Sequence, residues 1–87
     1  MTDAFAIVKH PLATEKAIRT MESENKLTFV VEYGSTKAQI KKAVVSLFSA
    51  KVIAVRTYVT AKGQKRAVVT FHKDTPAIDI ATDLGVL

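Results

Sequence analysis

The sequence predicts a single α+β domain, a sandwich in which helices cover a four-stranded, mainly antiparallel sheet, with the element order β-α-β-α-β-β-α. Three observations lead to this prediction. Four segments have the alternating or β-branched composition of strands, and three segments have apolar residues at helical spacing. A short connection around Gly63 then joins the third and fourth strands as a hairpin. Because a chain of 87 residues suits one small core, we expect residues 1–87 to form one domain.

The first strand is expected at residues 4–8 (AFAIV), and it ends before Pro11. Proline lacks a backbone N–H and disfavours a helical residue before it. A helix follows, with Thr14 as its N-cap and Glu15 in its first turn, where the helix dipole favours a carboxylate. This helix fades within residues 22–25.

The second strand is expected at residues 26–33, where the odd-numbered apolar residues share one face. The next helix is the clearest in the chain. Thr36 and Gln39 have the spacing of a capping box. Its apolar residues, from Ile40 to Phe48, recur at i, i+4, i+7 and i+8 and form one buried face.

The third strand is expected at residues 51–60, and both of its faces are partly apolar. Helices could therefore cover both faces of the sheet. One of these faces is expected to carry Ile53, Val55, Thr57 and Val59. The return strand is expected at residues 66–73. Thr75 is the expected N-cap of a last helix, with Pro76 at its first position and Gly85 at its end. The packing residues of this helix are expected to be Ile78, Ala81 and Leu84.

The charge of the chain is basic, with a formal net charge of +5, and it is unevenly distributed. No acidic residue occurs between Tyr33 and Lys73. The charged residues of that segment are Lys37, Lys41, Lys42, Lys51, Arg56, Lys62, Lys65, Arg66 and Lys73. A block of one sign repels itself, so it indicates an anionic partner, most often a polyphosphate backbone. The alternative is a merely soluble basic surface, although mixed signs would serve solubility better.

Motifs for catalysis or for metal binding are not found in the sequence. There are no cysteines, the two histidines are far apart, and the three glycines are isolated. We therefore expect no catalytic residue, no cofactor and no metal. No apolar run approaches the roughly 20 residues of a membrane span, and the first ten residues do not resemble a signal peptide.

An RNA-recognition motif would need exposed aromatic residues on the sheet, on which bases stack. Tyr58 could serve in this way, but Phe29 and Phe71 are expected in the core. The sequence therefore favours recognition of folded RNA by its shape and its phosphates over the reading of single-stranded bases.

Four segments of the chain carry a resemblance to a known family. They are KHPLATEKA (9–17), TKAQIKKAVVSLF (36–48), KVIAVRTYV (51–59) and KRAVVTF (65–71). In this order and spacing they resemble the universal large-subunit ribosomal protein number twenty-three. The resemblance implies the same fold and a cytoplasmic, ribosomal protein that is monomeric within the large subunit. It implies binding to large-subunit ribosomal RNA near the polypeptide exit tunnel, beside neighbouring ribosomal proteins.

The resemblance also implies a docking site for exit-site factors, such as the signal recognition particle or a nascent-chain chaperone. Glu15 matches the glutamate that these factors use. The connection at residues 61–65 is short, as in the compact archaeal form, and lacks the long basic extension of bacterial members.

The residues expected to bind RNA combine this resemblance with the charge pattern. They are Lys9, His10, Thr14, Lys16, Lys37, Lys41, Arg56, Thr57, Lys62, Lys65 and Arg66. Where the family has Val-Asn-Thr, this chain has Val-Arg-Thr at residues 55–57, so Arg56 could contact a phosphate in place of an amide contact.

Two other functions remain open from the sequence. A nucleic-acid-binding protein outside the ribosome, such as a chromatin-like duplex binder, would bind unrelated duplex DNA comparably. A small α+β enzyme would need a pocket with perturbed titratable groups, for which the sequence offers no candidates.

Overall fold

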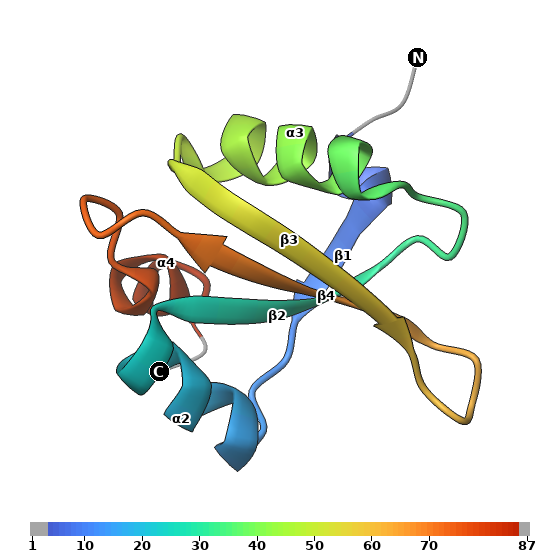
Figure 1. Ribbon diagram of the computed structural model, residues 1–87, viewed down its shortest axis with the longest axis horizontal. Coiled ribbons are helices and arrows are strands. Elements are labelled where there is room, and N and C mark those ends of the chain that lie inside the picture. The colour runs from blue at the N-terminus through green and yellow to red at the C-terminus, as the bar shows by residue number, and fades with distance from the viewer. Residues whose placement is uncertain (1–3, 86–87) are drawn as a thin grey trace.

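The computed structural model describes residues 4–85, which form a four-stranded sheet with helices packed against it (Figure 1). The ends of the expected domain, residues 1–3 and 86–87, lie outside the described residues. The elements are α1 (Ala4–Ile7), β1 (Val8–Pro11), α2 (Glu15–Glu24), β2 (Lys26–Val31), α3 (Lys37–Phe48), β3 (Val52–Val59), β4 (Lys65–Phe71) and α4 (Ala77–Asp83). The strand order is β1-β2-β4-β3, and every neighbouring pair is antiparallel. The predicted fold class is confirmed, and α1 is the one addition to the predicted order.

The core lies on one face of the sheet. Leu27, Phe29 and Val31 of β2 are buried there, as are Ala67, Val69 and Phe71 of β4. The helices α3 and α4 pack their apolar sides into the same cluster, and α2 contributes Met21. The rings of Phe29 and Phe48 stack with their centroids 5.7 Å apart. The inward faces predicted for both central strands are therefore confirmed.

The caps predicted for α2 and α3 are also present. The Thr14 hydroxyl accepts a hydrogen bond from the Ala17 N–H at 3.2 Å. Thr36 and Gln39 form the reciprocal capping box, with distances of 2.9 and 3.2 Å. These contacts involve only residues three positions apart, which is why the sequence predicts them.

The strand predicted at residues 4–8 is wrong in its position. Residues 4–7 form the helical turn α1, and the strand begins at Val8. The partner strand β2 ends at Val31, which pairs with Val8, so a strand extended toward residue 4 would have no ladder to join. A helical turn lets this backbone hydrogen-bond within itself, and Ile7 is buried in the core.

The face predicted for Ile53 is also wrong. The register between β3 and β4 shifts between Val52 and Ala54, which makes Ile53 the extra residue of a bulge. Ile53 is 59% exposed, whereas Val52 and Val55 pack against the core. A bulge inserts one residue into the strand, which shifts the alternation of faces on one side of it. A strict period of two therefore assigns Ile53 to the wrong face.

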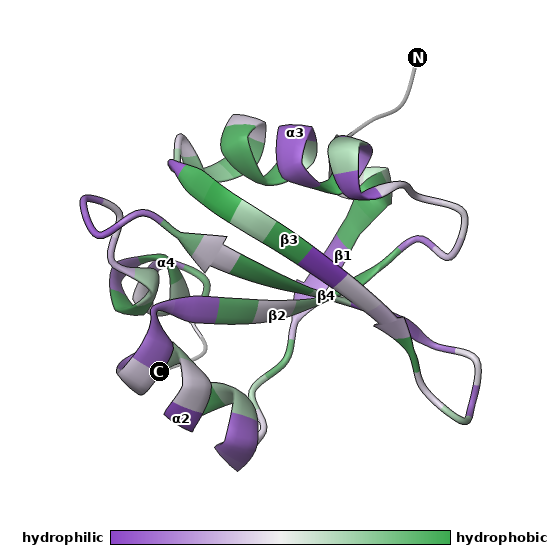
Figure 2. Ribbon diagram, viewed as in Figure 1, coloured by the Kyte–Doolittle hydropathy of each residue, from purple (hydrophilic) through white to green (hydrophobic). Residues whose placement is uncertain are grey.

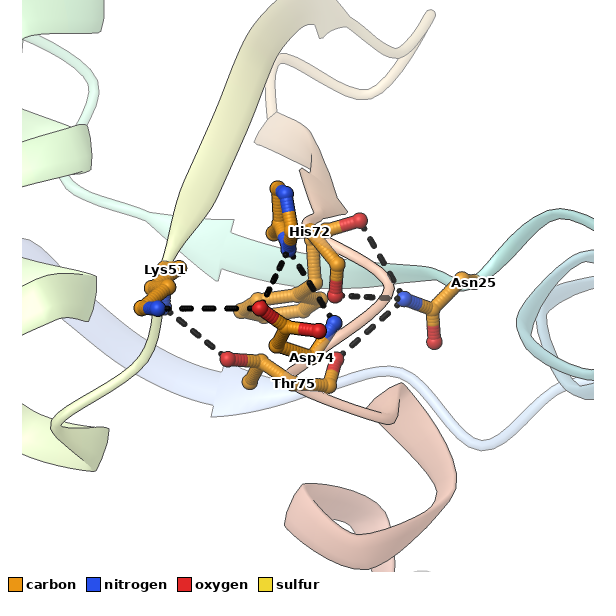
Figure 3. A network of polar contacts seen from close by, with 6 residues as sticks. Asn25, Lys51, His72, Asp74 and Thr75 are labelled. Atoms are coloured by element: carbon orange, nitrogen blue, oxygen red, sulfur yellow. Dashed lines mark hydrogen bonds and ion pairs between the residues drawn. The ribbon is translucent and has the colours of Figure 1, made fainter.

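The start of α4 differs from the prediction as well. The N-cap is Pro76 and not Thr75, and Pro76 has no side chain that can accept a capping hydrogen bond. The Thr75 hydroxyl instead accepts from the Lys51 N–H at 3.1 Å, at the start of β3 (Figure 3). The inward residues of α4 are Ala77, Ile80 and Ala81, while Ile78 and Leu84 are exposed. Gly85, with φ of +75°, ends the helix as predicted.

Candidate nucleic-acid interface

The sheet has a second face, opposite the core. Residues that pair directly across antiparallel strands point to the same face. Val30 pairs with His10 on β1 and with Arg66 on β4, and Arg66 in turn pairs with Tyr58 on β3. These four residues therefore form a row across the whole sheet, with a polar or aromatic side chain on every strand but β2.

A second row runs beside the first. Thr28 pairs with Val68, and Val68 pairs with Arg56. Lys26, two residues before Thr28 on β2, points to the same face as Thr28, because successive residues of a strand alternate between the two faces. This face of the sheet therefore brings together basic residues from strands that are not neighbours.

Helix α2 turns this face into a groove. An open hollow of about 580 Å³ lies between α2 and the sheet. The helix side contributes Thr14, Lys16 and Thr20, and the sheet side contributes Arg56, Tyr58 and Arg66. Figure 1 shows α2 as a separate helix beside β2, and Figure 2 shows that much of it is hydrophilic, in contrast with the largely hydrophobic strands. We call this hollow the α2–sheet groove.

The cations of the α2–sheet groove are mostly available to a ligand. Lys26 pairs with Glu24 at 3.4 Å, which also lines the groove. Within residues 4–85, neither Lys16 nor Arg56 forms an ion pair, and both are exposed. The Arg66 Nε donates to the Gln64 side-chain oxygen at 2.8 Å, which holds its guanidinium near the hairpin without neutralising it.

The hairpin between β3 and β4 extends this basic surface. A second hollow of about 450 Å³ is lined by Thr60, Lys62, Gln64 and Arg66. Arg66 lines both hollows, so it joins the groove to the hairpin. Gly63, with φ of +83°, makes the tight turn there as predicted.

The other predicted RNA-binding residues lie elsewhere. Thr57 is half-buried on the core side of the sheet, where it pairs with Ala67. Lys65 also lies on that side, and its ammonium donates to the Ser35 carbonyl. Lys9 is exposed and pairs with Glu32 at 3.5 Å. The structure therefore brings Thr14, Lys16, Arg56, Lys62 and Arg66 to the groove and the adjoining hairpin. His10 lies on the same face of the sheet but lines neither hollow, and Lys9, Thr57 and Lys65 are separate from them.

Helix α3 carries the remaining predicted contacts. Lys37 and Lys41 are exposed, one helical turn apart, and α3 packs on the core side of the sheet. A ligand in the α2–sheet groove could reach them only by passing around an edge of the molecule.

The predicted partner residue Glu15 lies at the first turn of α2. Its carboxylate accepts from the Arg19 guanidinium at 2.7 Å, and both side chains are largely exposed. Neither residue lines the α2–sheet groove, although the flanking Thr14 and Lys16 do. The start of α2 therefore offers two different surfaces, one toward the groove and one away from it.

Lys26 lines the groove but is absent from the predicted RNA-binding residues. The alternation of β2 places it on the face of Thr28, and this signal was present in the sequence. What the sequence lacks is the order and register of the strands: β4 lies between β2 and β3, and its pairing with both aligns Lys26 and Arg56 on one face.

Within residues 4–85, two other kinds of functional element are absent. No group of three or more histidine, cysteine, aspartate or glutamate residues is placed to hold a metal ion. None of the helices is long and apolar enough to cross a membrane.

Comparison with known proteins places the chain among ribosomal proteins. The sequence pattern of the family described as Ribosomal protein L23 matches residues 6–80. The protein named large ribosomal subunit protein uL23 of Methanococcus vannielii is 42% identical over 84 residues, and that of Methanococcus maripaludis strain C7 is 40% identical. Each alignment covers 97% of this chain and 98% of the relative. The chain therefore belongs to the ribosomal protein L23 family.

Proposed function

We propose that this chain is a structural constituent of the large ribosomal subunit and binds large-subunit ribosomal RNA near the polypeptide exit tunnel. Its membership of the L23 family supports a structural role in the cytoplasmic ribosome, as does the near-complete alignment with archaeal relatives named for the large subunit. In this role the chain is a monomer within the subunit, contacts neighbouring ribosomal proteins and performs no catalysis.

The observation that supports RNA binding most strongly is the α2–sheet groove. Lys16, Arg56 and Arg66 approach it from three separate elements, α2, β3 and β4. Phosphate contacts by such cations provide much of the affinity for a nucleic acid and fix its orientation. An open groove on a rigid sheet holds these charges at fixed spacings, which suits a folded RNA better than a flexible basic tail would.

The remaining predicted residues extend the interface in this proposal. Lys62 continues the groove along the hairpin, and His10 lies on the same face of the sheet at β1. Lys9 is next to His10 in the chain and contacts RNA only if the RNA extends beyond this face. Lys37 and Lys41 present a second basic surface on α3. Thr57 and Lys65 lie on the core side, where they contact RNA only if it folds around the β3 edge or the hairpin.

Glu15 is the proposed contact for a protein partner. It lies outside the α2–sheet groove, so RNA in the groove would leave it open to solvent. A carboxylate beside a basic RNA-binding surface suits a basic residue of an exit-site factor, such as the signal recognition particle or a nascent-chain chaperone.

The test is binding of the purified chain to fragments of large-subunit ribosomal RNA across a salt series. Unrelated duplex DNA and transfer RNA serve as competitors. We expect a fragment-specific complex whose affinity falls steeply as salt rises. Equal binding to every polyanion would favour the alternative, a nucleic-acid-binding protein that acts outside the ribosome.

Matched variants locate the interface. Lys16→Ala and Arg56→Ala each remove one exposed cation from the groove, while Lys73→Ala removes one exposed cation from the loop before α4. We expect each groove variant to weaken binding and to lower the salt slope by about 0.7–0.9, and the Lys73 variant to do neither. Equal effects of all three would show that net charge, and not the groove, determines binding.

A further inference from the structure

The α2–sheet groove contains one aromatic residue, Tyr58, whose exposure the proposed phosphate contacts do not explain. Tyr58 is 45% exposed although it lies within β3 and not in a loop. It belongs to the sheet face opposite the core, and it lines the groove together with cations. A large aromatic side chain usually buries its ring, so an exposed ring on a rigid strand within a basic groove indicates a ligand with a flat face.

The neighbours of Tyr58 are placed to hold the backbone of such a ligand. Arg66 lies directly opposite Tyr58 in the β3–β4 register, so their Cβ atoms are about 5 Å apart. Arg56 is two residues before Tyr58 on the same face of β3, at about 7 Å along the strand. Tyr58 therefore has an arginine on each of two sides, at backbone spacings comparable with the length of one nucleotide.

We infer that Tyr58 stacks against a single unpaired base of the RNA, with Arg56 and Arg66 contacting the phosphates on either side of that nucleotide. This inference rests on the proposed function and adds one base contact to it. The base must be unpaired, because bases within an RNA duplex are stacked on each other and closed to a side chain. It also revises the expectation from sequence, in which the surface recognised phosphates and shape alone.

The chain provides its own reporter for this contact. It has two tyrosines, Tyr33 and Tyr58, and no tryptophan. In Tyr33→Phe the only tyrosine emission comes from Tyr58, and in Tyr58→Phe it comes from Tyr33. Tyr33 is 61% exposed and does not line the groove, so it is the matched control.

We expect a large-subunit ribosomal RNA fragment that binds the protein to quench the emission of Tyr58 strongly and that of Tyr33 little, after correction for absorption by the RNA. Both variants keep an aromatic ring at each position, so we expect neither substitution to disturb the fold. Equal quenching of the two tyrosines, or none at Tyr58, would overturn the inference.

Affinity provides an independent readout. Tyr58→Leu should weaken binding of the fragment about tenfold, because the stacking surface is lost, while Tyr58→Phe should stay within about twofold of the parent. The salt slope should not change in either, because no charge is removed. Binding by Tyr58→Leu as tight as that by Tyr58→Phe would contradict stacking. Circular dichroism of Tyr58→Leu checks that the strand is intact.

The base itself is tested with fragments in which each unpaired nucleotide in turn lacks its base. At one position the parent and Tyr58→Leu should bind equally, because the contact is already absent. If no position removes the difference, stacking is wrong even though RNA binding stands. If the parent protein shows no preference for ribosomal RNA fragments, the proposed function fails first, and the inference fails with it.

Discussion

The side chain of Asn25 caps a helix that begins 52 residues later: its amide oxygen accepts from the Ala77 N–H at 2.6 Å. The amide nitrogen of Asn25 donates to the carbonyls of Phe71, His72 and Thr75 at 3.2 Å each (Figure 3). Asn25 itself has φ of 56°, a left-handed conformation that asparagine tolerates well. One residue thus ends α2, holds the end of β4 and replaces the missing side-chain cap of α4.

We expect Asn25→Ala to lower the free energy of unfolding by about 2–3 kcal/mol, because the contacts of its two amide N–H groups and its amide oxygen are lost and alanine is strained at positive φ. Asn25→Gly removes the side chain without that strain, so it should lose less, about 1–2 kcal/mol. Urea denaturation of the two variants separates the effects of the side chain and the backbone. An Asn25→Gly variant as stable as the parent would show that the amide contacts contribute nothing.

Glycine substitutions test the hairpin. Gly63→Ala should cost about 1 kcal/mol because residue 63 has φ of +83°, even though a Cβ there meets no atom within 4 Å. Gly34→Ala is the matched control, since its Cβ would also meet nothing within 4 Å and its φ is not positive. We expect that control to match the parent or to be about 0.5 kcal/mol more stable in urea. Equal losses at both positions would show that φ does not decide the outcome.

Two adjacent basic residues should behave differently. Lys65→Met removes the hydrogen bond to the Ser35 carbonyl, so it should cost about 1 kcal/mol of stability and leave most of the RNA affinity. Arg66→Met removes a cation of the groove, so it should weaken RNA binding and lower the salt slope by about 0.7–0.9. Chemical denaturation and a salt series on both variants make the comparison. The opposite result would mean that RNA lies against the core side of the hairpin.

The surface of α3 is tested by Lys37→Ala combined with Lys41→Ala. If RNA contacts both side chains, as we expect, the salt slope should fall by about 1.5 without a change in stability. Exchange of Gln39 for alanine is the wrong control, because Gln39 is part of the capping box. Lys42→Ala removes another exposed lysine of the same helix, so its salt slope shows the effect of lowering the charge of α3 at a position outside the predicted contacts. An unchanged slope in the double variant would remove α3 from the interface.

Glu15 is tested on the RNA-bound protein. Glu15→Gln should weaken binding of a signal recognition particle or a nascent-chain chaperone and leave RNA affinity unchanged, because Glu15 lies outside the groove. Arg19→Gln releases the carboxylate from its ion pair of 2.7 Å, so it should preserve or improve partner binding. Pull-down and titration of the partner on both variants provide the measurement. Weakened binding by Arg19→Gln alone would assign the contact to Arg19.

Local contacts account for the parts of the fold that the sequence predicts correctly. The caps at Thr14 and Thr36 and the turn at Gly63 each depend on residues within four positions. The inward faces of β2 and β4 follow from alternation, since Phe29 and Val69 need only a partner layer to be buried. Binary pattern and short-range hydrogen bonds therefore suffice for these elements.

The errors share one cause, which is contact between distant segments. Residues 4–7 are helical because β2 ends too early to pair with them, and Ile53 is exposed because a bulge shifts the β3–β4 register. Thr75 does not cap α4 because its hydroxyl accepts from Lys51 and Asn25 caps in its place. None of these partners is near in sequence, so no local pattern predicts them.

The sequence by itself determined the fold class, the family and the one-sign charge block, because composition, periodicity and motif order carry them. Only the tertiary structure decided which of those charges act together. Alternation along β3 and β4 places Lys65 and Thr57 on the core side. The strand order β1-β2-β4-β3 and its register bring Arg56, Tyr58 and Arg66 together on the open face, beside the groove that Lys16 of α2 also lines. A side chain acts with its neighbours in space, and the order of strands in a sheet depends on long-range packing that no single segment contains.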